Sequence, residues 1–240
     1  MFRWSIWFRK PELPITTPGI YHNSTLWLLS YSSDWSTWYT IADKDLWASE
    51  VYWQWLLYQR WNNYWFTLSN WNTNISTTQV DTTWYWPWNY YSDNTYIANW
   101  TWYSNWFNPD NLDLWWWATG TYAAMQGPCP NWFHIPSTTD FNTVTWIVTT
   151  LKSSTDINDC RGYFYIGNIS TIYNHNSNPY ARTGTDYRTH ISDWSSRYPN
   201  YAHMYSNYPW IGSIWSTSAF PIRPFKNEPV QPTTKWTRLI

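Results

Sequence analysis

The chain has 240 residues, a formal net charge of −1 and only 12% charged residues. It is long enough to bury one large hydrophobic core, and so few charges argue against a nucleic-acid-binding surface. No apolar run reaches the roughly 18 residues of a membrane-spanning helix. Residues 1–10 also lack the apolar core and cleavage site of a signal peptide. We therefore expect no nucleic-acid partner and no membrane span in this chain.

The first half of the chain predicts short strands and loops. Residues 1–37, broken by prolines, are interpreted as a poorly determined lead. Residues 38–42 predict a strand, 43–45 a turn, and 46–58 form an apolar run. Residues 61–112 are rich in Asn, Ser, Thr, Trp and Tyr and show no helical period. A stretch of this length is too long for one structureless loop, so short irregular hairpins are predicted.

Residues 127–151 predict a strand that turns sharply into an amphipathic helix. Residues 133–135 are strand-like, and Pro136 keeps the residue before it out of the helical region. Ser137 or Thr138 can then cap a helix that carries Asp140 in its first turn, where a negative charge suits the helix dipole. The buried face of this helix would be Phe141, Val144, Val148 and Leu151.

The rest of the chain predicts a small antiparallel sheet. Residues 120–126 are expected to form a short helical turn, and residues 163–167 a strand. Residues 168–190 are polar and rich in Asn. Residues 191–196, 203–205 and 219–225 are predicted to be the closing strands, and residues 227–240 a terminal arm.

The chain has 26 Trp and only 7 Gly. Average usage would give roughly 17 Gly in this length, and a turn-rich chain should not be poor in glycine. Several Trp, at positions 38, 47, 61, 65 and 132, stand in contexts that suit glycine. We expect that many Trp correspond to UGA codons, which some bacteria read as glycine. The alternative is a genuinely aromatic surface.

Four segments carry a resemblance to one bacterial family. Residues 129–141 read Cys-Pro-x-x-Phe-His-Ile-Pro-Ser-x-x-Asp-Phe, and residues 41–46 read Ile-Ala-Asp-Lys-Asp-Leu. Residues 193–196 read Asp-Trp-Ser-Ser, and residues 220–225 read Phe-Pro-Ile-Arg-Pro-Phe. In order and spacing these segments resemble the Fibrobacter succinogenes major paralogous domain (FISUMP) family, and the central motif is the most specific of them.

The resemblance implies an α+β fold: an irregular C-type-lectin-like domain with a small antiparallel sheet, one or two helices and long loops. It places a lead at residues 1–37, the domain at 38–227 and a C-terminal arm at 228–240. It also implies an extracellular or cell-surface location. The residues that match its motifs are Cys129, His134, Pro136, Asp140, Trp194 and Arg223.

Two cysteines, Cys129 and Cys160, are present. The family usually pairs its motif cysteine with one near the C-terminal strand, and here Pro224 stands at that position. Cys129 therefore either pairs with Cys160 or remains a thiol. The missing cysteine also keeps open the interpretation that this is a decayed paralogue without function.

Candidate catalytic and metal-binding residues have simpler structural interpretations. His134 could be a general base or a metal ligand, but packing at the strand–helix corner is favoured. Asp43, Asp45 and Glu50 could supply paired carboxylates for glycoside chemistry, but Asp43 and Asp45 suit a turn. Residues 108–113 offer oxygens for calcium, although they lack the EF-hand pattern. No catalytic residue and no cofactor are therefore assigned.

Aromatic residues near position 88 suggest a possible glycan surface. If their Trp are genuine, the clusters 84–88 and 115–117 could stack on sugar rings. If several are glycine, the platform shrinks to Tyr85, Trp88, Tyr90 and Tyr91. The expected function is a non-catalytic binding or adhesion domain whose partners are glycans or cell-surface proteins. The alternatives are a carbohydrate-binding module or glycan-active enzyme, and the decayed paralogue.

Overall fold

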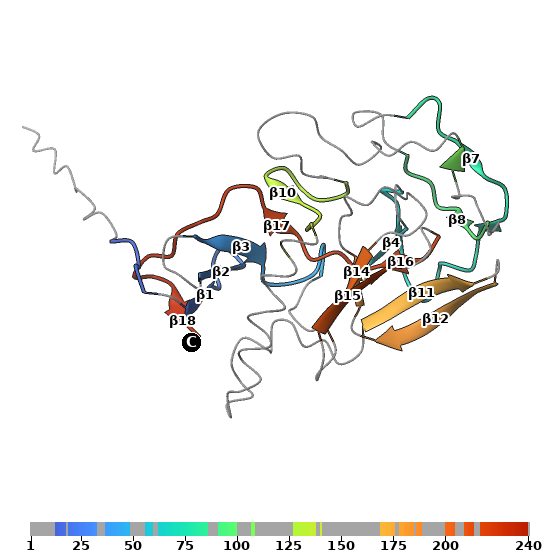
Figure 1. The fold of residues 1–240 in the computed structure, drawn as a ribbon. Helices are drawn as coiled ribbons and strands as arrows, with labels where there is room; N and C mark the ends of the chain where they lie inside the picture. Colours follow the sequence, from blue (N-terminus) through green and yellow to red (C-terminus); the bar gives the residue numbers. More distant parts are fainter. Residues whose placement is uncertain are drawn as a thin grey trace, which may run out of the picture.

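The structure is a computed structural model, and it describes residues 13–17, 19–32, 37–48, 56–59, 62–85, 91–99, 107–108, 127–137, 140, 169–175, 178–184, 186–188, 200–204, 209–213 and 217–239. Strands in mostly antiparallel sheets dominate these residues (Figure 1). The sheet-rich part of the predicted fold class is therefore confirmed. Asp140 has helical backbone, and the rest of the helix expected to follow it lies outside the described residues.

A six-stranded antiparallel sheet joins the two ends of the described chain. Its strands lie in the order β10 (Phe133–His134), β17 (Phe225–Lys226), β3 (Tyr39–Ala42), β2 (Leu28–Ser32), β1 (Gly19–Asn23) and β18 (Thr237–Arg238). Strand β3 agrees with the strand predicted over residues 38–42. Pairing crosses both expected domain boundaries, because β2 pairs with β3 and β1 pairs with β18.

A second antiparallel sheet has five strands. Their order is β12 (Asn178–Gly184), β11 (Ile169–His175), β16 (Ala219–Phe220), β4 (Leu57–Gln59) and β5 (Trp65–Phe66). The β11–β12 hairpin pairs over seven residues, from Ile169 with Gly184 to His175 with Asn178. Strands were not expected in this polar segment, because it lacks the alternation of apolar residues that marks a half-buried strand.

Smaller sheets complete the described structure. Strands β13 (Asp186–Arg188), β14 (Asn200–Met204) and β15 (Pro209–Ser213) form an antiparallel sheet. Strand β6 (Ile75–Ser76) pairs with β8 (Tyr96–Ile97), and β7 (Val80–Asp81) pairs with β9 (Phe107–Asn108). Both of these pairings are parallel, so the hairpins predicted within residues 61–112 are wrong at these strands. Parallel partners must lie far apart in sequence, as these do.

The chain between β16 and β17 passes from the five-stranded sheet to the six-stranded sheet (Figure 1). It buries Ile222 and Arg223. Ile222 belongs to a hydrophobic cluster that lies between the two sheets and contains Leu46, Tyr58, Tyr91, Ile97, Cys129 and Ile135. A second cluster, around Phe66, Tyr96 and Ile172, lies on the five-stranded sheet. The short connector therefore links the two sheets and contributes to a cluster that contacts both of them, through Tyr58 of β4 and Phe133 of β10.

Candidate binding pocket

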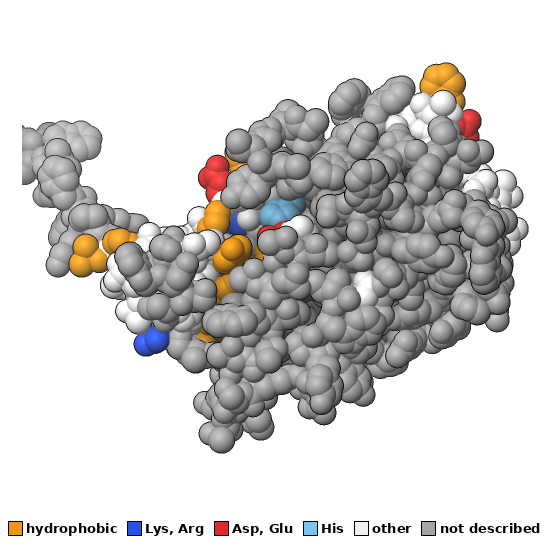
Figure 2. Space-filling model, in the orientation of Figure 1, with side chains coloured by type: hydrophobic (Ala, Val, Ile, Leu, Met, Phe, Trp, Pro, Cys, Tyr) orange, Lys and Arg blue, Asp and Glu red, His pale blue; other side chains and the backbone are white. Residues whose placement is uncertain are grey.

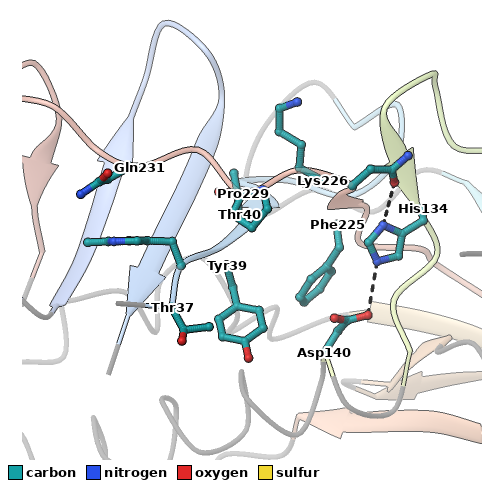
Figure 3. A pocket seen from close by; sticks show the side chains of 11 residues that line it. Thr37, Tyr39, Thr40, His134, Asp140, Phe225, Lys226, Pro229 and Gln231 are labelled. Atoms are coloured by element: carbon teal, nitrogen blue, oxygen red, sulfur yellow. Dashed lines mark hydrogen bonds and ion pairs between the residues drawn. The ribbon is translucent and has the colours of Figure 1, made fainter. Parts of the chain in front are cut away.

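An open pocket of about 470 Å³ lies where β3, β10 and β17 meet the chain that follows β17. In Figure 3 the side chains of Tyr39, Phe225, Asp140 and His134 lie next to one another, whereas Lys226 points away from them. We call it the His134 pocket. Its described lining is Thr37, Trp38, Tyr39, Thr40, His134, Asp140, Phe225, Lys226, Asn227, Pro229 and Gln231.

Sheet pairing sets the positions of these side chains. Strand β17 lies between β3 and β10, with Phe225 opposite both Ile41 and His134. The chain after β17 then returns over the sheet. It is held there because Val230 donates its backbone N–H to the Thr40 hydroxyl at 2.7 Å, and the Ser30 hydroxyl donates to the Val230 carbonyl at 2.7 Å. The chain after β17 is therefore fixed to β2 and β3, beside the strands that carry the rest of the pocket.

His134 is held from both ring nitrogens. Its Nε2 lies 3.3 Å from Asp140 Oδ2, and its Nδ1 lies 2.9 Å from Asn227 Oδ1 (dashed lines in Figure 3). A carboxylate only accepts hydrogen bonds, so the Nε2 position facing Asp140 carries a proton. The Nδ1 contact is satisfied either by a second ring proton or by the amide group of Asn227 turned to donate. Either way the ring is fixed in position at the pocket wall.

Asp140 combines a structural role with its contact to His134. Ser137 donates its backbone N–H and its hydroxyl to Asp140 Oδ2, each at 2.7 Å. The Asp140 N–H in turn donates to the Ser137 hydroxyl at 3.1 Å. These reciprocal bonds are a helix capping arrangement, in agreement with the predicted cap. Desolvation acts to raise the pKa of Asp140, but the hydrogen bonds from His134 and Ser137 and the charge of His134 together lower it below its ordinary value.

The pocket combines polar groups with aromatic faces. Among the described lining residues, Lys226 supplies an ammonium group, Asn227 and Gln231 supply amides, and Asp140 is the one carboxylate. Tyr39 and Phe225 place rings on the side of the pocket next to Asp140 (Figure 3). In Figure 2 a histidine side chain is visible at the surface beside basic, acidic and hydrophobic side chains. Such a mixture suits a polar ligand that also presents an apolar face.

The aromatic residues that were expected to bind sugar lie elsewhere. Tyr91 is buried in the cluster between the sheets, and Tyr85 packs against it with ring centroids 5.3 Å apart at 87°. Burial, together with the nearby Asp93 and Tyr85, raises the pKa of Tyr91. As placed, this pair is part of the core and offers no flat exposed platform. Trp88 and Tyr90 lie outside the described residues.

The other described motif residues are buried and do not line the pocket. Cys129 is a buried thiol in the cluster between the sheets, and burial raises its pKa. Pro136 is also buried. Arg223 forms a buried ion pair with Asp45, with Arg223 Nε 2.9 Å from Asp45 Oδ1. Cys160 and Trp194 lie outside the described residues, so the Cys129–Cys160 pairing stays a prediction.

The acidic residues considered for glycoside or calcium chemistry do not line the His134 pocket. Asp43 Oδ2 is hydrogen-bonded to His22 Nε2 at 3.0 Å, and Asp45 pairs with Arg223. Glu50 and most of residues 108–113 are outside the described part of the chain. No group of three or more His, Cys, Asp or Glu side chains that could hold a metal ion occurs among the residues that the structure describes.

Sequence reasoning named His134 and Asp140, for which it favoured structural roles, and missed their neighbours in the pocket. Asn227, Lys226 and Gln231 were assigned to the end of the domain and its arm, whereas they form one wall of the pocket. His134 and Asn227 are 93 residues apart in the chain, and no local pattern links them. One usable signal was present in the sequence. His134 lies in the central motif, and Asn227 follows the closing motif by only two residues.

Within the described residues, no helix is long and apolar enough to cross a bilayer. No protein-family model, curated protein or solved structure matches the chain.

Proposed function

We propose that the chain is a cell-surface, non-catalytic binding domain that holds a neutral polar ligand, a saccharide in particular, in the His134 pocket. The observation that carries this proposal is the pocket itself, whose lining includes a rigidly held imidazole, two amides and the half-buried ring of Tyr39. Its volume falls within the range of about 300–1,000 Å³ that is usual for small-molecule sites.

The chemistry of the lining favours a saccharide over a charged ligand. Asp140 and Lys226 contribute one carboxylate and one ammonium group to the described lining, so no cluster of like charges stands ready for a charged ligand. The amides of Asn227 and Gln231 can each donate and accept hydrogen bonds, as a sugar hydroxyl does. The half-buried ring of Tyr39 offers an apolar face to the C–H face of a pyranose.

The family resemblance supports the proposal for location. Three of its four motif segments meet in the structure: β3 and residues 41–46, β10 and Asp140, and residues 220–225. The buried Asp45–Arg223 ion pair joins the first of these segments to the last. Because these motif segments contact one another, they form one structural unit within the domain. The lectin-like fold and the surface location are part of the same proposal.

A glycan-active enzyme is the second candidate, and one observation bears on it. Glycosidases commonly need two carboxyl groups that flank the scissile bond. The described lining of the His134 pocket supplies one, Asp140, and its oxygen is already used by Ser137 and His134. The geometry therefore supports binding better than hydrolysis. A decayed paralogue remains the alternative in which the pocket binds nothing.

Glycan-array screening of the full chain, followed by titration calorimetry of the best ligand, tests the proposal. We expect Asn227→Ala and Lys226→Ala each to weaken binding about fivefold to thirtyfold, since each removes a polar contact worth about 1–2 kcal/mol. Lys44→Ala is the matched control, because it removes the same charge outside the pocket lining. A cooperatively folded chain that binds no glycan, or that loses affinity equally in Lys44→Ala, overturns the saccharide proposal.

A further inference from the structure

Three Trp residues occupy a backbone conformation that disfavours every residue with a side chain. Trp27, Trp47 and Trp132 have φ angles of 57°, 63° and 72°. All other described residues with positive φ are glycines. In this region the Cβ atom of an L-residue crowds the following carbonyl, and glycine avoids the clash because it has no Cβ. It is unusual for a bulky aromatic residue to occur there.

Two of these residues hold the turn position that requires glycine. Ala48 donates its N–H to the Asp45 carbonyl at 2.9 Å, so Trp47 is the third residue of a four-residue turn. Phe133 donates in the same way to the Pro130 carbonyl at 3.1 Å, which makes Trp132 the third residue of its turn. Leu46 and Asn131, the second residues, do not have positive φ. Positive φ at the third position alone is the pattern of a type II turn, where glycine is preferred.

Trp27 closes the hairpin between β1 and β2. The Asn23 side-chain oxygen accepts the N–H groups of Thr25 and Leu26, at 3.1 and 3.0 Å. Trp27 then takes the left-handed conformation immediately before β2 begins at Leu28. Hairpin loops that end in one left-handed residue commonly place glycine there. All three Trp therefore stand at turn positions with one shared steric requirement.

Packing gives no compensating reason for an indole at these positions. Trp27, Trp47 and Trp132 are 60%, 68% and 68% exposed. The Lys44 ammonium group lies 4.3 Å from the ring centroid of Trp27, but a cation–π contact at an exposed site is weak. Trp236, by contrast, is buried in a cluster with Tyr21, Leu28 and Trp38, and its φ is not positive. The Trp residues thus fall into structurally different classes.

We propose that the natural polypeptide carries glycine at positions 27, 47 and 132, because its gene has UGA codons there that the source cell reads as glycine. The composition, with 26 Trp and 7 Gly, supports the same substitution without reference to any φ angle. Among the described residues, the backbone points to these three positions. At the same three turns, the exposed indoles would be absent from the surface of the natural protein.

Mass spectrometry of the protein isolated from its source tests the proposal directly. Tryptic peptides that span residues 27, 47 and 132 should each have the mass expected for glycine at that position, and the corresponding codons should be UGA. A peptide with the mass of tryptophan at any of the three, or a UGG codon there, overturns the proposal for that position. This measurement does not depend on whether the chain folds when it is produced as written.

Thermal unfolding of the recombinant full chain tests the conformational argument separately. Trp27→Gly, Trp47→Gly and Trp132→Gly should each raise Tm by about 2–4 °C, because relief of left-handed strain exceeds the entropy that glycine adds to the unfolded chain. Trp84→Gly is the matched control. Trp84 is also the third residue of a hydrogen-bonded turn and is 70% exposed, but its φ is not positive. An equal rise in Trp84→Gly, or no rise in the other three, contradicts the argument.

Discussion

The Asp45–Arg223 ion pair should be one of the most sensitive points of the fold. Arg223 is 1% exposed, and its guanidinium group donates to Asp45 Oδ1 at 2.9 Å and to the Ala42 carbonyl at 3.3 Å. Arg223→Met removes the guanidinium group that compensates the charge of the buried Asp45 carboxylate. The expected cost is about 3–5 kcal/mol of unfolding free energy. For a chain of this length, that corresponds to a fall in Tm of about 6–20 °C.

A double-mutant cycle measured by urea denaturation separates the pair from its surroundings. We expect Asp45→Leu to cost about as much as Arg223→Met, and the double variant to be more stable than the sum of the two costs predicts, because it leaves no buried charge. Arg238→Met is the matched control, since Arg238 is exposed on β18 and should change stability by less than about 0.5 kcal/mol. If Arg223→Met costs under about 1 kcal/mol, or if the two costs simply add, the reasoning fails.

Three further measurements test other parts of the structure. The pKa of Asp140 is lowered from 3.8 in the folded state. The ionised carboxylate therefore stabilises the fold fully above pH 3.8, and this stabilisation is lost as the pH falls through the folded-state pKa. In urea titrations the unfolding free energy should fall more steeply with acid in the parent than in Asp140→Asn, and equal slopes would contradict this. Gln59→Leu should cost about 2–5 kcal/mol, because the buried amide bonds two backbone carbonyls and one backbone N–H, whereas exposed Gln231→Leu should be nearly neutral in the same denaturation assay. The buried Cys129 thiol should react with a thiol reagent far more slowly in folded than in urea-unfolded Cys160→Ser protein, and equal rates would show that Cys129 is accessible.

The sequence predicted best where local chemistry decides the structure. The cap at Ser137 and Asp140 follows from residue types at fixed spacing, and the structure shows its reciprocal hydrogen bonds. Strand β3 follows from a short β-branched and aromatic run. In each of these cases the relevant partners lie within a few residues, so the information is present in one stretch of the chain.

The sequence failed where distant segments decide the structure. Strands β1 and β18 were assigned to a lead and an arm, yet they pair with each other across more than 200 residues of chain. Their stability comes from partners that no local pattern reveals, and β18 has only two residues. The His134 pocket has the same origin, since one wall comes from the central motif and the other from the chain after β17. Tyr91 was expected on an exposed sugar-binding platform, yet it is buried in the core. Its aromatic side chain alone could not distinguish these two environments.

The proposed glycines change the interpretation of the surface more than that of the pocket. A glycan-binding surface built from exposed Trp depends on those residues being real, and three of the most exposed are the ones in left-handed turns. The His134 pocket includes one Trp, Trp38, which is buried and whose φ is not positive. Its hydrogen-bonding groups come from residues whose identity is not in question. Loss of indoles at the turns would therefore remove apolar surface and backbone strain while leaving the His134–Asp140–Asn227 arrangement unchanged, so ligand binding in the pocket should survive all three glycine substitutions.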